Sequence, residues 1–538
     1  MNRRHARLGL AAASALALAA SASCRRVEPG AALFQTADAC TGCHNGLRTP
    51  AGEDVSIARE WMATMMANSA RDPYWQASVR REIIDHGDAQ AAIEDECSIC
   101  HTPMATFAAR ALGTHGVVFA HLAPQTAGST TDLLAADGVS CTVCHQIERD
   151  RLGSPESFTG RFAIDTRQVP LRSAFGRFAI DAGRARIMST ASGFLPAEAQ
   201  QIRQAELCAT CHTLFTGTAG SHGRLPEQVP YLEWLHSDYR SQRSCQSCHM
   251  PRVAAPTPIA SVVSVPRPDF ARHSFTGANF FMMRVLAAND AAVGMTTPPD
   301  SMRAHADETI AYLQRTAAKV TVEDARPDNR GVVFTVRVDA LAGHKLPTAY
   351  PSRRAWLHVN VRDSRGRTLF ESGAMRPNGA IAGNDNDDDA TRFEAHYQEI
   401  VRPDQVQIYE SIMIDDRGSV TTGLLSAVDY IKDNRLLPTG FDKATVQEDA
   451  AVRGEAMNDA DFTGGSDRLR YVATIAAGAQ PPFSIDVELC YQPIGFRWAQ
   501  NLRRYRAAEP ARFVSYYEAQ ARLSAAVLAR AKATIAAR

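Results

Sequence analysis

The sequence has no excess of either charge, because its 58 basic and 58 acidic residues give a formal net charge of +0. This balance gives no sign of a basic nucleic-acid-binding surface, so we expect no nucleic acid partner. Beyond the first two dozen residues the sequence also lacks an apolar run of the roughly 20 residues that a membrane helix needs. The 45% hydrophobic and 22% charged residues are typical of a soluble protein, and 538 residues suffice for two or three structural units.

The first residues have the features of an export signal. Arg3, Arg4 and Arg7 precede a short Ala/Leu run from Leu8 to Ala20, which is too short to span a bilayer. Ala20-Ser21-Ala22 fits a cleavage site and predicts a signal peptide over residues 1–23. The alternative is a lipoprotein site that ends at Cys24. We therefore expect an exported protein, in the periplasm or at the outer surface of a bacterium, either soluble or tethered by a lipid on Cys24.

Ten of the twelve cysteines fall in five copies of the pattern C-x-x-C-H. This pattern is the attachment site of c-type haem. Two thiols three positions apart bond to one haem, and the imidazole of the next residue ligates its iron. The sequence therefore predicts five covalently attached haem c groups with proximal histidines, at Cys40/Cys43/His44 (motif 1), Cys97/Cys100/His101 (motif 2), Cys141/Cys144/His145 (motif 3), Cys208/Cys211/His212 (motif 4) and Cys245/Cys248/His249 (motif 5).

Zinc is the alternative ligand for such cysteine pairs. A zinc ribbon needs two pairs about 15 to 20 residues apart. Only motifs 4 and 5 lie anywhere near that spacing, and zinc leaves the histidine after every pair unexplained. Of the other two cysteines, Cys490 falls on the polar side of a predicted strand, where we expect an ordinary single thiol.

The sixth ligand of each iron decides the function, because a second histidine or a methionine favours electron transfer whereas an empty position can bind a small molecule. No motif replaces its histidine with lysine, the mark of the open catalytic haem in pentahaem nitrite reductases. The seven candidate distal ligands are His86, His115, His121, His222, His236, His273 and His344. Glycine and small residues flank His273 and His344 and let the backbone approach a flat macrocycle. We expect His305, His358 and His396 at the surface, and methionines such as Met62 in core packing.

The motifs also predict the domain organisation. All five lie between residues 40 and 249, too densely for a conventional core, so the haems must form the core. We expect a pentahaem domain of short helices and irregular loops over residues 24–275, then a helical linker over 276–319. Period-two alternation predicts an antiparallel, immunoglobulin-like β-sandwich over 320–500. Pro510 suits the first turn of a C-terminal helix over 505–538. We expect a solvated acidic turn at Asn384 to Asp389; calcium binding there is the alternative.

Several longer segments resemble a family of bacterial multihaem cytochromes, in which a multihaem region of the cytochrome c-554 kind precedes a haemless β-domain. They are Asp137 to Ile147, Glu206 to Leu214, Pro226 to Leu235, Cys245 to Pro251, and the segments around His273 and His344. The resemblance implies an electron carrier in which His273 and His344 ligate haem, so that His344 would join the β-domain to the haem array. Where such proteins often have a histidine before motif 4, this chain has Gln201, which leaves one iron's partner open.

Three functions follow as hypotheses. The first is an electron-transfer cytochrome that exchanges electrons with redox partner proteins. The second is a redox enzyme that acts on a small nitrogen or sulfur compound at one five-coordinate haem. The third is a subunit of an extracellular cytochrome assembly, which requires an oligomer.

Overall fold

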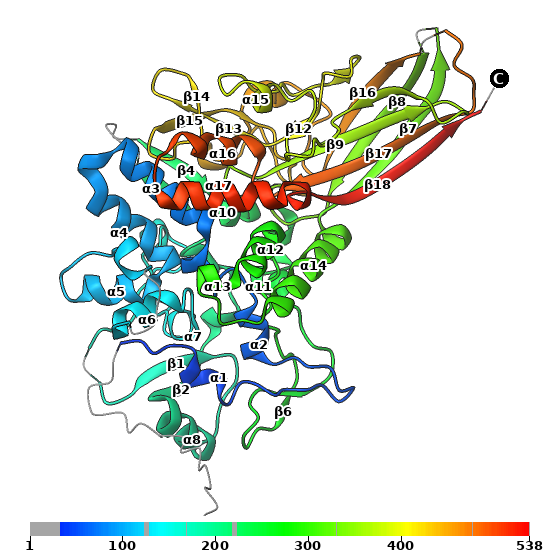
Figure 1. Ribbon diagram of the computed structural model, residues 1–538. Helices are drawn as coiled ribbons and strands as arrows, with labels where there is room; N and C mark the ends of the chain where they lie inside the picture. The colour runs from blue at the N-terminus through cyan, green and yellow to red at the C-terminus, as the bar shows by residue number, and fades with distance from the viewer. Residues whose placement is uncertain are drawn as a thin grey trace, which may run out of the picture.

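The computed structural model describes residues 33–122, 128–167, 169–217, 223–329, 331–475 and 477–536. The predicted signal peptide, Cys24 and His222 lie outside these ranges. The chain has two parts: short helices make up the lower part in Figure 1, and long strands the upper part. Within the described ranges, no helix combines the length and the apolar character that crossing a membrane requires.

The first part consists of short helices and three two-stranded sheets. Its longest helix, α3 (Pro73–Asp85), begins where Asp72 accepts hydrogen bonds from two backbone N–H groups of the first turn, and Pro73 suits that turn. The other elements are α1 (Asp38–Thr41), α2 (Ile57–Met62), α4 (Gln90–His101), α5 (Pro103–Ala111), α6 (Thr130–Ala136), α7 (Cys141–Cys144), β1 (Arg172–Gly176), α8 (Ala182–Ser192), β2 (Phe194–Glu198), α9 (Ala205–Ala209), β3 (Leu214–Gly217), β4 (Arg224–Gln228), α10 (Pro230–Leu235), α11 (Cys245–His249), β5 (Thr257–Pro258) and β6 (Pro266–Arg267).

Helices α12 (Phe280–Ala288), α13 (Asp290–Val293) and α14 (Pro299–Thr316) connect the two parts. Helix α12 is buried on nearly every side, because Phe280, Phe281 and Met282 are all fully buried. Apolar residues all around a helix are typical of a position in the interior. Helix α14 packs beside α12 and leads directly into the first long strand (Figure 1).

The second part contains two main sheets that share one core. Their strand orders are β10-β9-β17-β18, with β12 beside β9, and β11-β16-β8-β7; a third sheet has the order β14-β13-β15. Val336, Leu357 and Leu489 contribute to the common core and are fully buried. The predicted antiparallel sheets are confirmed, although β11 runs parallel to β16, and the immunoglobulin-like arrangement stays a prediction. The strands are β7 (Ala318–Asp328), β8 (Gly331–Ala340), β9 (Arg354–Arg362), β10 (Thr368–Ser372), β11 (Glu399–Ile400), β12 (Ile408–Tyr409), β13 (Ser411–Asp415), β14 (Val420–Thr421), β15 (Ala427–Asp433), β16 (Ser466–Thr474), β17 (Phe483–Gln492) and β18 (Ala526–Ile535).

The prediction of a C-terminal helix over 505–538 is wrong in its second half. Helix α17 (Ala508–Gln520) ends early, and β18 pairs antiparallel with β17. The alanine-rich sequence of β18 has a high intrinsic helix propensity. However, Arg530 and Lys532 are exposed while Ala531 packs against the core and Ile535 is buried, which is the alternation of a strand. Burial against β17 outweighs the local propensity.

Two smaller expectations are also wrong. Asp387 lies in α15 (Asp385–Asp388), and its side chain is buried rather than solvated because it forms a two-pronged ion pair with Arg354, with both N–O distances 2.8 Å. Cys490 is 8% exposed, because Trp356 and Val406 cover the face of β17 that was expected to be polar.

Polar contacts join the two parts along α3. Arg80 forms an ion pair with Glu509 of α17 at 3.0 Å. The next two residues of α3 also make such contacts: the guanidinium of Arg81 donates to the carbonyl of Thr422 at 2.5 Å, and Glu82 accepts a hydrogen bond from the backbone N–H of Leu424 at 2.9 Å. The C-terminal part therefore supports a helix that lies between motifs 1 and 2 in the sequence.

Candidate functional site

Each of the five motifs lies on or beside a short helix. Motif 2 ends α4, motifs 3 and 5 form α7 and α11, and motifs 1 and 4 begin in α1 and α9. Residues three positions apart are neighbours on a helix, so both thiols of a motif emerge on the same side. All ten motif cysteines are free thiols of intermediate exposure. They are therefore available for a covalent bond to a common group.

Four of the five predicted proximal histidines are held in one orientation by backbone carbonyl groups. A carbonyl oxygen can only accept, so the ring nitrogen Nδ1 must carry the proton and the other nitrogen, Nε2, keeps its lone pair. Such a bond orients a histidine for a metal ion. The distances from Nδ1 are 2.6 Å for His44 to Ile259 O, 3.0 Å for His101 to Ser69 O, 2.5 Å for His145 to Phe175 O and 2.6 Å for His249 to Thr276 O.

Two candidate distal histidines lie opposite proximal ones. The rings of His273 and His145 are 6.5 Å apart between centroids and 15° from parallel, and those of His344 and His249 are 6.3 Å apart and 9° from parallel. Two metal–nitrogen bonds of about 2 Å, plus about 1 Å from each nitrogen to its ring centre, span about 6 Å. Each pair of rings therefore has the spacing that one iron ion between them requires.

The distal rings are oriented in the same way as the proximal ones. Nδ1 of His273 donates to the carbonyl of Ala271 at 3.1 Å, and Nδ1 of His344 donates to that of Lys345 at 2.9 Å. Burial, with a further contribution from His145, lowers the pKa of His273 to about 3. Burial also lowers the pKa of His344. Both rings are therefore neutral, the form that binds a metal.

The motifs lie side by side in space. A hydrogen bond to Cys141 is the main cause that raises the pKa of the Cys40 thiol, which brings motifs 1 and 3 together. The same kind of contact joins motif 2 to motif 4 through Cys100 and Cys211, and motif 4 to motif 5 through Cys208 and Cys245.

Apolar packing gives the same arrangement. Ala37, which lies three residues before Cys40 of motif 1, shares a cluster with Cys141 of motif 3. Ile99, Val143 and Cys211, from motifs 2, 3 and 4, share another cluster. Ala209 and Cys245, from motifs 4 and 5, share a third. Motif 4 is therefore the centre of a branched group, and motif 1 and motif 5 lie at different ends.

Two other candidate histidines are held by polar side chains. Nε2 of His86 lies 3.3 Å from the hydroxyl of Ser426 and 3.8 Å from a carboxylate oxygen of Glu82. Nδ1 of His121 lies 2.6 Å from Asp132, a carboxylate that orients the ring. Among the ring contacts of the described residues, the His86 ring is not paired with a proximal histidine.

His115 is exposed and His236 is half-buried against Phe441, with 6.0 Å between the ring centroids. Among the ring contacts of the described residues, no histidine faces His44, His101 or His212. The stacking partner of His101 is Trp75, at 4.3 Å. Distal ligands at motifs 1, 2 and 4 therefore stay predictions.

His305 was expected at the surface, but it is only 6% exposed. It lies seven residues before Tyr312, hence on the same face of α14, and the Tyr312 hydroxyl donates to the carbonyl of Cys248 in motif 5. Within the described residues, Nε2 of His305 has no hydrogen-bond partner. His305 is therefore an additional candidate ligand, which its charged neighbours in the sequence concealed.

Lys345, the residue after His344, belongs to a buried group of four charged side chains. The backbone N–H of Lys345 donates to Glu233 of α10 at 3.2 Å, and its fully buried ammonium group donates to Asp433 of β15 at 2.8 Å. Arg435 lies 2.7 Å from Asp433 and 2.9 Å from Glu233. The two positive and two negative charges balance, so each is compensated out of water. This group fixes the peptide that carries His344 against the motif-bearing part.

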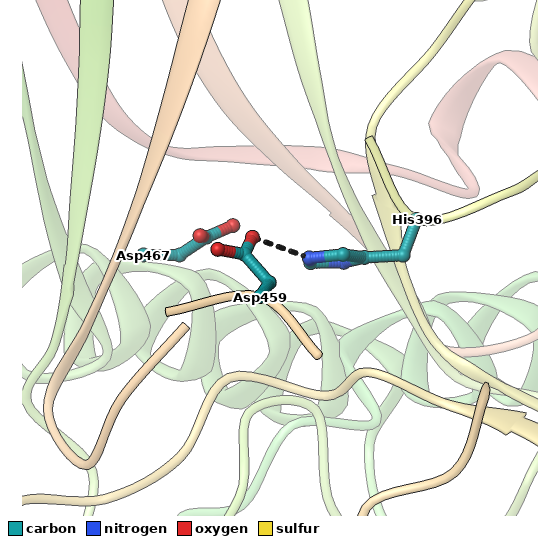
Figure 2. Close-up of side chains that lie close together, drawn as sticks. All are labelled: His396, Asp459 and Asp467. Carbon is teal, nitrogen blue, oxygen red and sulfur yellow. Dashed lines mark hydrogen bonds and ion pairs between the residues drawn. The ribbon is translucent and has the colours of Figure 1, made fainter. Parts of the chain in front are cut away.

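A second buried group, in the strand-rich part, has the composition of a metal site. Figure 2 shows Asp459 between His396 and Asp467, and one ligand atom from each lies within 4.8 Å of the others. His396 was expected at the surface but is 6% exposed. Nε2 of His396 lies 2.9 Å from Asp459.

The hydrogen bonds of His396 argue against a metal ion in this group. Its Nδ1 accepts from the side-chain amides of Gln407 and Asn434 at 3.0 and 3.1 Å. Both amides are oriented unambiguously, because their oxygens accept from the backbone N–H groups of Tyr397 and Glu410. Nδ1 thus holds the lone pair and Nε2 the proton, so Nε2 has no lone pair to offer to an ion. The group is a hydrogen-bonded network.

The fold defined by these elements is that of a multihaem cytochrome. The comparison that supports this is with the crystal structure of a penta-heme cytochrome c552 from Thermochromatium tepidum, which superposes with a TM-score of 0.53 at 15% sequence identity and covers 94% of this chain and 99% of that one. At this identity the likeness concerns the fold. No family model matches the sequence, and no curated protein matches it.

Proposed function

We propose that the protein is an exported pentahaem c-type cytochrome that transfers electrons between redox partner proteins, in the periplasm or at the cell surface. The observation that carries the proposal is the pairing of His145 with His273 and of His249 with His344. A second imidazole closes an iron to substrates and suits it for electron transfer.

In this proposal the residues of the chain would have the following roles. The ten motif cysteines attach the five haems, and the five motif histidines ligate the irons from the proximal side. Each haem, when bound, supplies an iron that alternates between the ferric and ferrous states. Carbonyl groups hold the ring nitrogens of His145 and His249 in place, so the ligands need not move when the charge of the iron changes. The branched contact of the motifs through motif 4 supports a relay with more than one end.

Electron paramagnetic resonance of the oxidised protein tests this proposal, because it counts low-spin and high-spin irons. We expect low-spin signals from at least the two bis-histidine irons. His273→Ala and His344→Ala should each convert one iron to high spin, whereas His358→Ala, a half-exposed histidine between two glutamates, should convert none. Unchanged spectra in both of the first two variants would refute the ligand assignment and remove the main support for electron transfer.

A redox enzyme with one five-coordinate haem is a second candidate. It is favoured by Gln201, which stands before motif 4, is 4% exposed and turns its amide to the carbonyl of Ile147 at 3.4 Å. A high-spin signal that shifts when nitrite or hydroxylamine is added would support this candidate. A subunit of a larger assembly is a third candidate; sedimentation that stays monomeric at high concentration would count against it.

A further inference from the structure

A hairpin of valines projects from the end of the molecule that is remote from the large sheets. Its arms are β5 and β6 (Figure 1), and its tip contains Val262, Val263 and Val265, which are 49%, 58% and 39% exposed. Val263 adopts a φ of +48°, an unfavourable backbone conformation for a β-branched residue. Such strain is often retained where a side chain must be presented for function. We call residues 259–265 the valine hairpin.

The apolar surface continues onto α8. Nε of Arg184 donates to the carbonyl of Val263 at 2.7 Å, and Ile187, one helical turn after Arg184, is 45% exposed. Of the fifteen large apolar side chains exposed in the described residues, six come from residues 171–195 and 259–265. Exposed apolar residues scattered singly need no explanation, but a concentration of them indicates a binding surface.

This surface lies directly on two of the motifs. Ile259 accepts the hydrogen bond from the proximal His44, and the backbone N–H of Ser261 donates to the carbonyl of Cys43 at 2.8 Å. On the neighbouring strand β1, Phe175 accepts the corresponding bond from His145. A partner that sits on the valine hairpin would therefore be separated from motif 1 by a single layer of backbone.

The surroundings of the valine hairpin are strongly basic in a chain whose net charge is +0. Residues 171–195 and 252–267 contain six arginines and one aspartate, for a net charge of +5. Within the described part of the chain, no carboxylate forms an ion pair with Arg177, Arg186 or Arg267. The guanidinium groups of Arg177 and Arg267 lie 5.3 and 5.7 Å from the ring centre of Phe178. Arg177 and Arg267 thus lie on Phe178 beside β6, and Arg186 lies on α8, the helix that contacts Val263 through Arg184; we call these three arginines the basic rim.

We propose that the valine hairpin and its basic rim are a docking surface for a small acidic redox protein, which exchanges electrons with the chain at motif 1. This inference rests on the proposed electron-transfer function. An apolar centre with a charged rim is the usual organisation of a protein interface, and the charge of the rim selects a partner of opposite sign. One electron passes from a reduced donor to a ferric haem, which becomes ferrous; no bond forms or breaks.

Stopped-flow reduction of the oxidised protein by flavodoxin hydroquinone, an acidic one-electron donor, tests the proposal. The flavin becomes a semiquinone as a haem is reduced. We expect a second-order rate that falls as salt is added, because salt screens the attraction between the two proteins. R186E/R267E should lower the rate at low salt at least about tenfold and remove most of the salt dependence. The matched control R402E/R417E, in exposed turns of the strand-rich part, should change it less than about twofold.

The apolar tip has its own variant. V262S/V263S should slow reduction by flavodoxin several-fold at every salt concentration, whereas Leu523→Ser, at a residue of equal exposure elsewhere, should leave the rate unchanged. Equal rates in all variants, or a wild-type rate that does not depend on salt, would overturn the proposal. So would self-association that V262S/V263S abolishes, because the hairpin would then bind a second copy. If the arginines of the rim only neutralise haem propionates, R186E/R267E will shift the reduction potentials but keep the salt dependence of the rate. That result would also overturn the proposal.

Dithionite separates the failure of this proposal from the failure of the proposed function. It is small enough to reach haems without a docking site. If dithionite reduces the wild-type haems reversibly and the variants react alike with flavodoxin, only the docking surface is wrong. If the haems are not reversibly reduced by dithionite, the electron-transfer function itself fails.

Discussion

Asp467 makes the stability of the strand-rich part depend on pH. Its carboxyl group is fully buried; one oxygen accepts from the hydroxyl of Tyr409 at 2.8 Å, and the other has no partner among the described residues. Burial, which is the largest cause, and the nearby carboxylate of Asp459 together raise the pKa of Asp467 from 3.8 to about 7. The other titratable groups around it are His396, Tyr471 and Lys443.

The sign follows from the protons bound by each state. Between about pH 4 and pH 7 the folded protein holds a proton on Asp467 that the unfolded chain releases, so the free energy of unfolding falls as the pH rises through this range. A shift of about three pKa units corresponds to about 4 kcal/mol at most. Asp467→Asn resembles the protonated form and has no proton to lose. At pH 8 it should therefore be more stable than the wild type by up to about 4 kcal/mol, and at pH 4 the two should be about equal.

Denaturant unfolding followed by far-ultraviolet circular dichroism, between pH 4 and pH 8, measures this difference. Other groups titrate equally in both proteins and cancel in the comparison. Asp416→Asn, at an exposed turn, is the control for removing a negative charge. If the stability curves of the wild type and Asp467→Asn run parallel across the range, the buried carboxyl does not titrate as argued and the reasoning is refuted.

Three other outcomes test separate features. Arg354→Lys should destabilise the protein by about 3 kcal/mol in denaturant unfolding, because lysine cannot form the two-pronged contact with buried Asp387, whereas exposed Arg402→Lys should have little effect. Leu528→Ala should cost about 3 kcal/mol because the side chain is buried in β18, and Lys532→Ala on the exposed side should cost less than about 0.5 kcal/mol; equal effects would contradict the strand. Glu233→Gln should shift the reduction potential of one haem in a redox titration, because it weakens the support of His344; Glu371→Gln, whose carboxylate lies 3.0 Å from His358 in the strand-rich part, should shift none.

The motifs and the two sharpest candidate distal histidines could be singled out in the sequence because their chemistry is local, and their role as haem ligands stays a proposal. The haem itself fixes the spacing of the two cysteines, and the glycine beside His344 leaves the space that a macrocycle needs. The burial of His305 and His396 could not be predicted in this way, because it depends on what packs over them. His305 lies on a helix with charged neighbours, and His396 is enclosed by Gln407 and Asn434 from other segments of the chain.

The C-terminal segment shows the same limit for the fold. Residues 526–535 contain four alanines, three of them at alternate positions, and alanine is the strongest helix former. The segment is nevertheless a strand, because β17 offers an unpaired edge and the core has room for Leu528. Neither the unpaired edge of β17 nor the space in the core can be deduced from the sequence of this segment. Intrinsic propensity decides a segment's structure only where tertiary packing does not favour another.

The contacts between the two parts imply that the motif-bearing part is not complete by itself. His344 comes from the strand-rich part and lies opposite His249, and Glu509 and the backbone of Leu424 hold α3 through Arg80 and Glu82. A chain that ends at residue 319 lacks all of these. We expect it to have one more high-spin iron than the full chain in electron paramagnetic resonance, and an α3 that proteases cleave. Full-length His344→Ala is the matched control, because it should lose the ligand but keep α3 protected. A shortened protein with the spin count and protease resistance of the full chain would show instead that the motif-bearing part supplies its own ligand, and that the strand-rich part is an addition to a finished haem array.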